Sequence, residues 1–161
     1  MLDSLDIHSS FAPEHFVPTH AGGVFRLPIR VYNQDIDAGR VVFVANYLKF
    51  MERTRTEWVR ALGGDFRQME RALRQTFVIR HVDASYLRPA FVDDLLLSEV
   101  SMSKLGRSYC VLAQRIEKDG VTLCDATVTA VCVDVVRFKP VPIPDFLHRE
   151  FARELKLVRG A

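Results

Sequence analysis

Residues 32–47 read Tyr-Asn-Gln-Asp-Ile-Asp-Ala-Gly-Arg-Val-Val-Phe-Val-Ala-Asn-Tyr, and they lead from a strand-like run into the longest helical pattern of the chain. Two acids, Asp35 and Asp37, stand one residue apart at the end of the apolar alternating run. The small, bendable step Ala38-Gly39 follows, and an amphipathic helix opens near Ala45. This order places a carboxylate close to a helix N-terminus, where free backbone N–H groups stabilise an anion. A carboxylate facing such a helix end can cleave an activated acyl compound, because the carboxylate promotes attack and the N–H groups stabilise the negative oxygen that forms.

The stretch 45–62 is predicted to be a long helix, because its apolar side chains recur at helical spacing on one face. The residues of this face are Tyr47, Phe50, Met51, Thr54, Trp58 and Ala61. Gly63-Gly64 supplies the C-terminal stop. A shorter helix is expected from Asp65, as its N-cap, through about Arg74.

Five runs are typical of strands, because apolar residues alternate within them and turn residues separate them. The first is expected over 24–32, where Pro28 implies an edge position or a bulge. The others are expected over 77–87, 94–104, 107–117 and 121–137. In the last run, small residues alternate on one face and would let a helix lie close to the sheet: Cys124, Ala126, Val128, Ala130 and Cys132.

One long helix followed by a meander of strands indicates an α+β fold, with an antiparallel sheet wrapped around a central helix. Residues 1–23 show no convincing period and are expected to form an irregular N-terminal arm, with Phe11, Phe16 and Val17 available for burial. Residues 24–161 are expected to form a single domain, ending in a short helix from about Asp145. A single sheet leaves edges and an uncovered face, so a homodimer is expected.

Composition excludes several classes of protein. A net charge of +2, from 22 basic and 20 acidic residues, gives no strong field toward nucleic acid. No stretch approaches the roughly 20 apolar residues that span a bilayer. The start, Met1-Leu2-Asp3-Ser4-Leu5-Asp6, lacks the basic-then-apolar order of a signal peptide, so a cytoplasmic location is expected.

Neither the cysteines nor the histidines predict a metal site. The three cysteines have no Cys-x-x-Cys spacing, and each falls in a strand-like run, so all are expected to be buried as small hydrophobic residues. His8, His15 and His20 match no common zinc pattern. We therefore expect no metal and no cofactor.

The motifs of residues 35–53 resemble those of the hotdog-fold acyl-CoA thioesterases. The resemblance rests on an ordered series: Asp35-Ile-Asp37-Ala-Gly39, Val42-Phe43, Asn46-Tyr47-Leu48 and Met51-Glu52-Arg53. It continues through Tyr86-Leu-Arg-Pro89-Ala90 and Asp93-Asp94, and it spans about 25–138. The pattern is similar to the 4-hydroxybenzoyl-CoA thioesterase type and to bacterial thioesterases associated with the Tol–Pal cell-envelope system. The resemblance implies a hotdog fold, a dimer or a tetramer of two dimers, and hydrolysis of a coenzyme A thioester.

The resemblance also implies roles for two residues. In such enzymes the second acid of the Asp-x-Asp segment is the catalytic carboxylate, which here is Asp37. The N–H at the start of the central helix binds the thioester carbonyl oxygen, which here implies the backbone of Val44. The Tol–Pal-associated members usually carry a histidine at the position of Val44, so this chain departs from them toward the aryl-CoA type. Asp37 is expected either to act as general base on water or to attack the thioester directly.

Several residues are candidates for substrate contacts. Gly39 provides backbone freedom and lets the substrate approach. Tyr47 falls on the buried helix face and is expected either in the core or lining an acyl pocket. Coenzyme A carries phosphates, and three basic residues at strand ends or turns are candidates for binding them, the alternative being ordinary surface charge: Arg88, Lys104 and Arg107.

The remaining titratable residues near these motifs and on the strands are expected to have structural roles instead of catalytic ones. Asp35 is expected to organise the turn. Glu52, beside Arg53 and Arg55, is expected to form a solvated or dimer-facing ion pair. His81 and Asp83 lie two apart on an expected strand and could pair on one face.

Two rival functions remain open at the level of sequence. One is hydrolysis of acyl carrier protein thioesters, and the other is non-catalytic binding of acyl-CoA by the same fold. The absence of a Gly-x-Ser-x-Gly nucleophile elbow argues against an α/β-hydrolase thioesterase.

Overall fold

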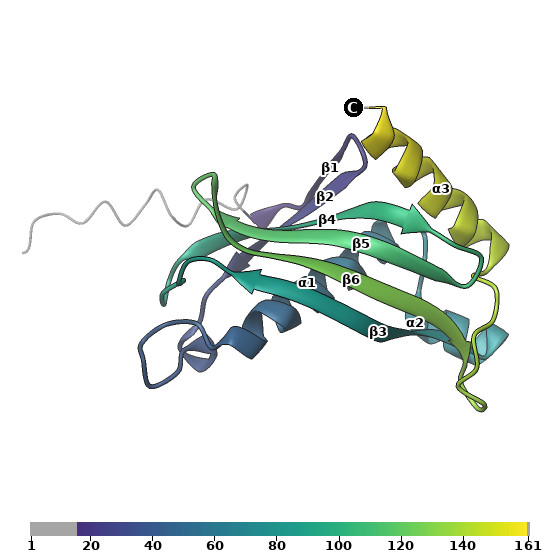
Figure 1. Cartoon of the computed structure of the whole chain (residues 1–161), viewed down its shortest axis with the longest axis horizontal. Coiled ribbons are helices and arrows are strands. Elements are labelled where there is room, and N and C mark those ends of the chain that lie inside the picture. Colours follow the sequence, from purple (N-terminus) through teal and green to yellow (C-terminus); the bar gives the residue numbers. More distant parts are fainter. Residues whose placement is uncertain (1–15, 161) are drawn as a thin grey trace, which may run out of the picture.

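A six-stranded antiparallel sheet with the strand order β1-β2-β4-β5-β6-β3 forms the body of the computed structural model, which describes residues 16–160 (Figure 1). The strands are β1 (Thr19–Ala21), β2 (Val24–Arg30), β3 (Gln75–Tyr86), β4 (Leu95–Leu105), β5 (Tyr109–Lys118) and β6 (Val121–Asp134). The helices are α1 (Val44–Ala61), the one-turn α2 (Phe66–Gln68) and α3 (Asp145–Arg159), with a 3-10 turn η2 (Asn33–Asp35) and a π-helical turn η3 (Met69–Leu73). One long helix on an antiparallel sheet confirms the predicted α+β fold class.

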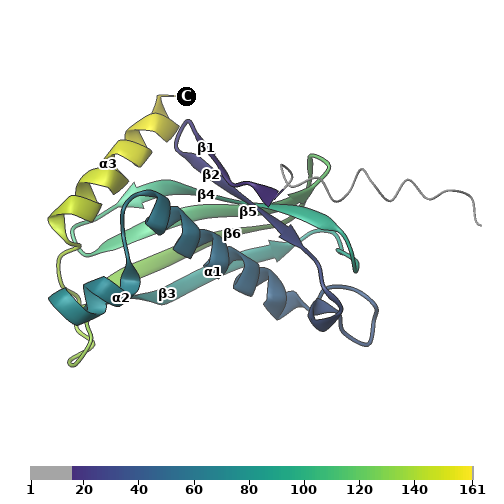
Figure 2. The same ribbon diagram turned by 180° about the vertical axis from the view of Figure 1, so that it is seen from behind.

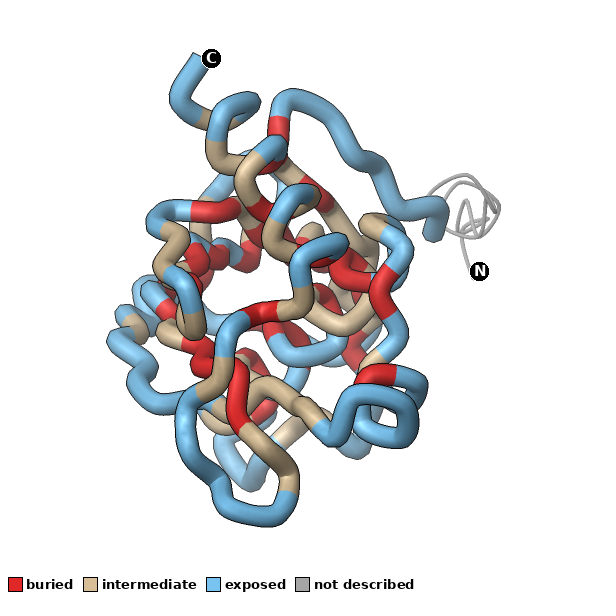
Figure 3. Tube along the Cα trace, turned by 90° about the vertical axis from the view of Figure 1, so that its right-hand side faces the viewer, coloured by how far each residue is buried: buried red, intermediate tan, exposed pale blue. Residues whose placement is uncertain are grey.

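The helix α1 lies across one face of the sheet, as Figure 2 shows from behind. It packs mainly against β4, β2 and β5. Five of the six residues of its predicted apolar face are buried: Tyr47, Phe50, Met51, Thr54 and Trp58. The Thr54 hydroxyl is satisfied by the Phe50 carbonyl at 2.8 Å and by Ser98 Oγ at 2.6 Å, so this polar side chain is compatible with the core. Figure 3 shows the buried segments gathered in the interior.

The helix α3 covers the far end of α1 and is longer than the short helix expected from the sequence. Phe151 stacks on Trp58 with ring centroids 5.1 Å apart and an interplanar angle of 5°. Beside them, Glu154 Oε2 accepts a hydrogen bond from Trp58 Nε1 at 3.4 Å and lies 2.8 Å from His20 Nε2. The apolar side chains of α3 thus pack into the same hydrophobic core as those of α1.

The N-terminal arm was predicted to be irregular, and part of it instead forms a strand. Thr19–Ala21 form strand β1, which pairs with β2 through the register Ala21↔Val24. The two residues of the turn, Gly22 and Gly23, have φ of 59° and 76°, the combination that a tight hairpin turn requires and that glycine adopts without strain. Residues 1–15 of the predicted arm, Phe11 included, lie outside the described residues.

The predicted strands are present, with shifted ends. The last strand stops at Asp134 instead of 137, because Asp134 Oδ1 accepts hydrogen bonds from the N–H groups of Val136 and Arg137, each at 2.9 Å. The small residues of β6 are buried as expected. However, α1 makes its main contacts with other strands, so this row does not provide the expected close approach for the helix.

The three cysteines are free and buried, as predicted. Burial raises the pKa of the Cys110 thiol to about 12, which keeps it protonated and unreactive at neutral pH. Within residues 16–160, no group of three or more His, Cys, Asp or Glu side chains is arranged to hold a metal ion. No helix in that same segment is long and apolar enough to cross a membrane.

Candidate active site

The loop between η2 and α1 is closed by backbone hydrogen bonds at its base. Ile36 and Val42 form an isolated antiparallel bridge. The Asp37 N–H donates to the Val41 carbonyl at 3.0 Å, and the Asp37 carbonyl accepts from the Arg40 N–H at 3.0 Å. Arg40 takes a φ of 63°, which completes the tight turn. The loop therefore brings Asp37 alongside the segment that leads directly into α1.

The carboxylate of Asp37 is exposed and is oriented by the backbone two residues later. Its Oδ1 accepts a hydrogen bond from the Gly39 N–H at 2.7 Å. A Cβ at Gly39 would lie 3.0 Å from this oxygen, so the absence of a side chain permits the contact without crowding. The second oxygen, Oδ2, has no partner among residues 16–160 and is available to solvent or substrate.

The N-terminus of α1 is an exposed set of hydrogen-bond donors. Phe43 is the N-cap residue and its side chain makes no capping hydrogen bond. Within residues 16–160, no acceptor lies against the N–H of Val44, and the side chain of Val44 is 49% exposed. Free N–H groups at the positive end of a helix dipole stabilise a negative oxygen.

Asp35 and Asn46 hold this helix end in place. The Asp35 carbonyl accepts from the Phe43 N–H at 3.0 Å and from Asn46 Nδ2 at 2.9 Å. The Asp35 carboxylate accepts from the Tyr32 N–H at 2.8 Å, which fixes the preceding turn. Asp35 thus organises the turn, as expected. Asn46 was part of the motif series but had no predicted role, although a polar residue at an inward-facing position of the first helical turn was a signal for one.

Tyr47 connects α1 to the turn that follows β3. It is 3% exposed, which places it in the core of the single chain. Its hydroxyl accepts from the Ala90 N–H at 3.1 Å and lies 3.5 Å from the Arg88 carbonyl. The Ala90 carbonyl accepts in turn from the Val42 N–H at 2.9 Å. Tyr47 therefore positions the 88–90 turn against the loop that carries Asp37, and it presents almost no surface to a substrate.

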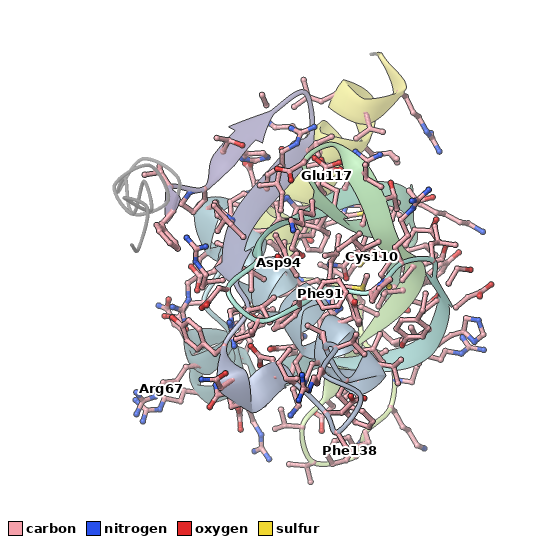
Figure 4. All side chains as sticks on the ribbon, turned by 90° about the vertical axis from the view of Figure 1, so that its left-hand side faces the viewer. Arg67, Phe91, Asp94, Cys110, Glu117 and Phe138 are labelled. Atoms are coloured by element: carbon pink, nitrogen blue, oxygen red, sulfur yellow. The ribbon has the colours of Figure 1, made fainter. Side chains whose placement is uncertain are left out.

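Burial raises the pKa of Tyr47, with the hydrogen bond from Ala90 opposing this shift in part. The phenol therefore stays protonated and keeps its donor for the Arg88 carbonyl. The turn itself is fixed by the Phe91 N–H, which donates to Asp94 Oδ2 at 2.9 Å, and by Lys118 Nζ, 2.7 Å from Asp94 Oδ1. Figure 4 looks onto this end of the molecule and labels Phe91 and Asp94.

Only one of the three basic candidates lies at this end of the sheet. Arg88 is exposed and follows directly on β3, beside the turn that Tyr47 contacts. Lys104 and Arg107 lie at the opposite end of β4, roughly 30 Å along the strand from its start at Leu95. One chain alone does not bring these two residues to Asp37.

The remaining candidates stand apart from Asp37. Glu52 is exposed on α1 and accepts from the Thr56 hydroxyl at 3.0 Å; it forms no ion pair within residues 16–160, and an ion pair that faces a second subunit stays a prediction. His81 and Asp83 are exposed on β3, and no contact joins them.

The chain was compared with families of known proteins. A family model described as the thioesterase superfamily matches residues 39–125. The acyl-CoA thioesterase YbgC of Haemophilus influenzae is 38% identical over 127 residues, which cover 79% of this chain and 93% of that protein. The long-chain acyl-CoA thioesterase FadM of Escherichia coli is 29% identical over 130 residues, which cover 80% of this chain and 97% of that protein.

The fold was also compared with solved structures. The crystal structure of a probable thioesterase from Bartonella henselae matches with a TM-score of 0.71 and 30% identity, covering 74% of this chain and 98% of that one. A 1,4-dihydroxy-2-naphthoyl-CoA thioesterase from Synechocystis matches with a TM-score of 0.75 at 18% identity, over 80% of this chain and 96% of that one.

Proposed function

The chain belongs to the thioesterase superfamily and hydrolyses acyl-CoA thioesters, and we propose that Asp37 and the N–H of Val44 carry out this reaction. The predicted hotdog fold is confirmed by the structural relatives. The single observation that supports the site is the combination of an exposed, oriented carboxylate with an uncapped helix N-terminus on one short loop.

The proposed chemistry needs two things from the protein. The thioester carbonyl oxygen becomes negative as a nucleophile adds to its carbon, and the Val44 N–H stabilises that charge. Asp37 either takes a proton from the attacking water or attacks the carbonyl carbon itself, giving a mixed anhydride that water then hydrolyses. In both routes the carbon–sulfur bond breaks, the thiol of coenzyme A leaves, and one water is consumed.

Release of free thiol from short-chain, long-chain and aromatic acyl-CoAs tests this proposal. Asp37→Asn should lower kcat by about 100- to 10,000-fold, the range for loss of a general base, while the protein stays folded. Asp125→Asn is the matched control, because Asp125 is an exposed aspartate on β6. Unchanged turnover in Asp37→Asn would remove this residue from the mechanism.

Arg88 is proposed to contact the phosphates of the coenzyme A carrier. The position of Arg88 beside the 88–90 turn supports this assignment. Free coenzyme A should inhibit competitively, and Arg88→Gln should raise KM with little change in kcat. Inhibition by acyl carrier protein, with none by coenzyme A, would favour the carrier protein thioester as substrate. Tight acyl-CoA binding without turnover would favour a binding protein.

A homodimer joined through β3 is proposed as the working form. β3 has 12 residues and, among residues 16–160, pairs only with β6, so it is an edge strand of the described sheet. Three apolar side chains on its helix-facing side, Ile79, Val82 and Tyr86, are 44%, 37% and 44% exposed. Light scattering should give the mass of two chains, or of four if two dimers associate. A cytoplasmic location is also proposed, supported by the three free cysteines.

A further inference from the structure

A pocket of about 250 Å³ opens between the C-terminal half of α1 and the start of β3. Its walls are mostly apolar and include Trp58, Phe66, Phe77, Ile79, Leu112 and Phe151. These side chains come from α1, α2, α3 and the sheet, so the pocket is part of the packed body of the protein. A pocket of this kind buries hydrocarbon readily.

One cation interrupts the apolar wall. Arg55 lines the pocket and is half-buried there. Its Nη1 donates to Gln114 Oε1 at 2.7 Å, and Gln114 Nε2 donates to the Met51 carbonyl at 3.0 Å. Gln114 is 3% exposed, so the guanidinium is held by a partner that is itself fixed.

The charge of Arg55 has no carboxylate in contact. Among residues 16–160, no Asp or Glu oxygen lies within ion-pair distance of its guanidinium. Glu52 borders the pocket at an exposed position, where its carboxylate accepts from Thr56. Burial lowers the pKa of Arg55, but a guanidinium remains protonated at neutral pH. Among residues 16–160 its guanidinium has one protein acceptor, Gln114 Oε1, and nearby Glu52, which lines the same pocket, acts on its pKa through charge without forming an ion pair with it.

Apolar side chains on the helix-facing side of β3, which are exposed in the single chain and are proposed above to meet a second subunit, link the Asp37 end of the protein to this pocket. Tyr86 lies at the end of β3 near the candidate site, with its ring 5.7 Å from that of Tyr47. Val82 and Ile79 follow on the same side of the strand, and Ile79 borders the pocket. Along α1, Arg55 lies about 16 Å from Val44 at roughly 1.5 Å per residue. An acyl group held at the helix N-terminus thus has an apolar path to follow.

We propose that this pocket receives the distal end of the acyl group and that Arg55 selects acyl chains ending in an oxygen acceptor, of which a carboxylate is the strongest. The proposal rests on the thioesterase activity above and narrows its substrate class. The apolar walls bury the methylene groups, while Arg55 supplies charge-assisted hydrogen bonds to the terminal oxygens. An acyl chain that ends in a methyl group should bind less well, because it would bury the Arg55 guanidinium without giving its N–H donors an acceptor.

Matched acyl-CoA pairs of three chain lengths test this selection. Each pair differs only in a terminal methyl or carboxylate: hexanoyl and adipoyl, decanoyl and sebacoyl, tetradecanoyl and tetradecanedioyl. We expect the wild type to favour the carboxylate member by about tenfold or more in kcat/KM at the length that reaches Arg55. Arg55→Met should remove or invert this preference at that length. Arg60→Met, which removes an exposed arginine of the same helix, should leave it unchanged.

Several outcomes would overturn the proposal. A wild type that prefers the methyl member at every length, or an Arg55→Met preference equal to that of the wild type, would remove Arg55 from substrate selection. Loss of the dimer in Arg55→Met, seen by light scattering, would assign Arg55 to the subunit contact instead. If Arg55→Met does not fold, Arg55→Lys decides, because it keeps the charge but loses the forked geometry and should show a weakened preference. No thiol release from any acyl-CoA by the wild type would instead be a failure of the proposed activity.

Discussion

At the first turn of α1, Phe43 and Val44 are each 49% exposed and no side chain caps the helix. Near its last turn, Trp58 is 1% exposed and lies stacked beneath Phe151. The N-terminal end leaves backbone donors free and is positioned by hydrogen bonds from neighbouring loops. The C-terminal end is fixed by burial of large side chains. The protein therefore separates the part that reacts from the part that supplies stability, and substitutions at the two ends should have separable effects.

Leu147→Ala should show the largest effect, and it should fall on stability alone. Leu147 is fully buried on α3, and removing a buried leucine side chain costs about 2–5 kcal/mol. Chemical denaturation should record this loss, while kcat per folded molecule on a short-chain acyl-CoA stays near the wild-type value. A comparable fall in kcat would show that the two ends are not independent.

Val44→Pro should produce the opposite result. Proline is tolerated at the first position of a helix, and the preceding Phe43 already has the extended conformation that proline requires, with φ −62° and ψ 133°. The substitution therefore removes the N–H with little disturbance. We expect kcat to fall by about 100- to 1,000-fold, as for loss of one oxyanion donor, with a nearly unchanged melting temperature. Val44→Ala keeps the N–H and should remain active.

Tyr47→Phe should affect both quantities moderately, because Tyr47 connects the helix to the candidate site. The buried Ala90 N–H would lose its acceptor, which costs about 1–3 kcal/mol. The freed turn should also lower kcat and exchange its Ala90 amide hydrogen faster. Tyr109→Phe, at the far end of the sheet, is the control. An unchanged Ala90 exchange rate would contradict the positioning role.

Asp134→Asn should give the smallest effect, a change in stability that depends on pH. The N–H groups of Arg137 and Val136 hold the pKa of Asp134 below its ordinary value. Its contribution to stability is therefore present above the ordinary carboxyl pKa of about 3.9 and is lost as the pH falls through the lower folded value. Melting curves should show the wild type slightly more stable at neutral pH, with the difference vanishing in strong acid. A difference that grows in acid would contradict this assignment.

Elements with a strong local signal were predictable from the sequence. The apolar spacing of Tyr47 to Trp58 placed α1 within one residue of its observed ends, and glycine turns separated the later strands. The hairpin before Val24 was missed, because β1 has only three residues and its pattern is too short to show alternation. The signal for it was Gly22-Gly23.

Long-range contacts could not be predicted in the same way. Phe151 and Trp58 are far apart in sequence, and nothing local indicates that their rings stack. Lys104 and Arg107 were grouped with Arg88 by charge and by their position at strand ends or turns, but the direction of β4 decides which of these ends lies near Asp37. The pocket that Arg55 lines combines α1, α2, α3 and three strands, and no single stretch of sequence contains residues from all of them.

The unpaired edge of β3 affects how prone a newly synthesised chain is to aggregation before it dimerises. Within residues 16–160 no strand covers this edge, so its backbone groups are unpaired there, and an unpaired edge is a template for aggregation. The register shift between Ile79 and His81, together with the charged side chains of Arg80 and Asp83, breaks the flatness of that edge. The register shift and these charges favour pairing of two β3 strands in one specific register over non-specific association of edges. They predict that soluble yield will depend on how quickly synthesis brings two chains together.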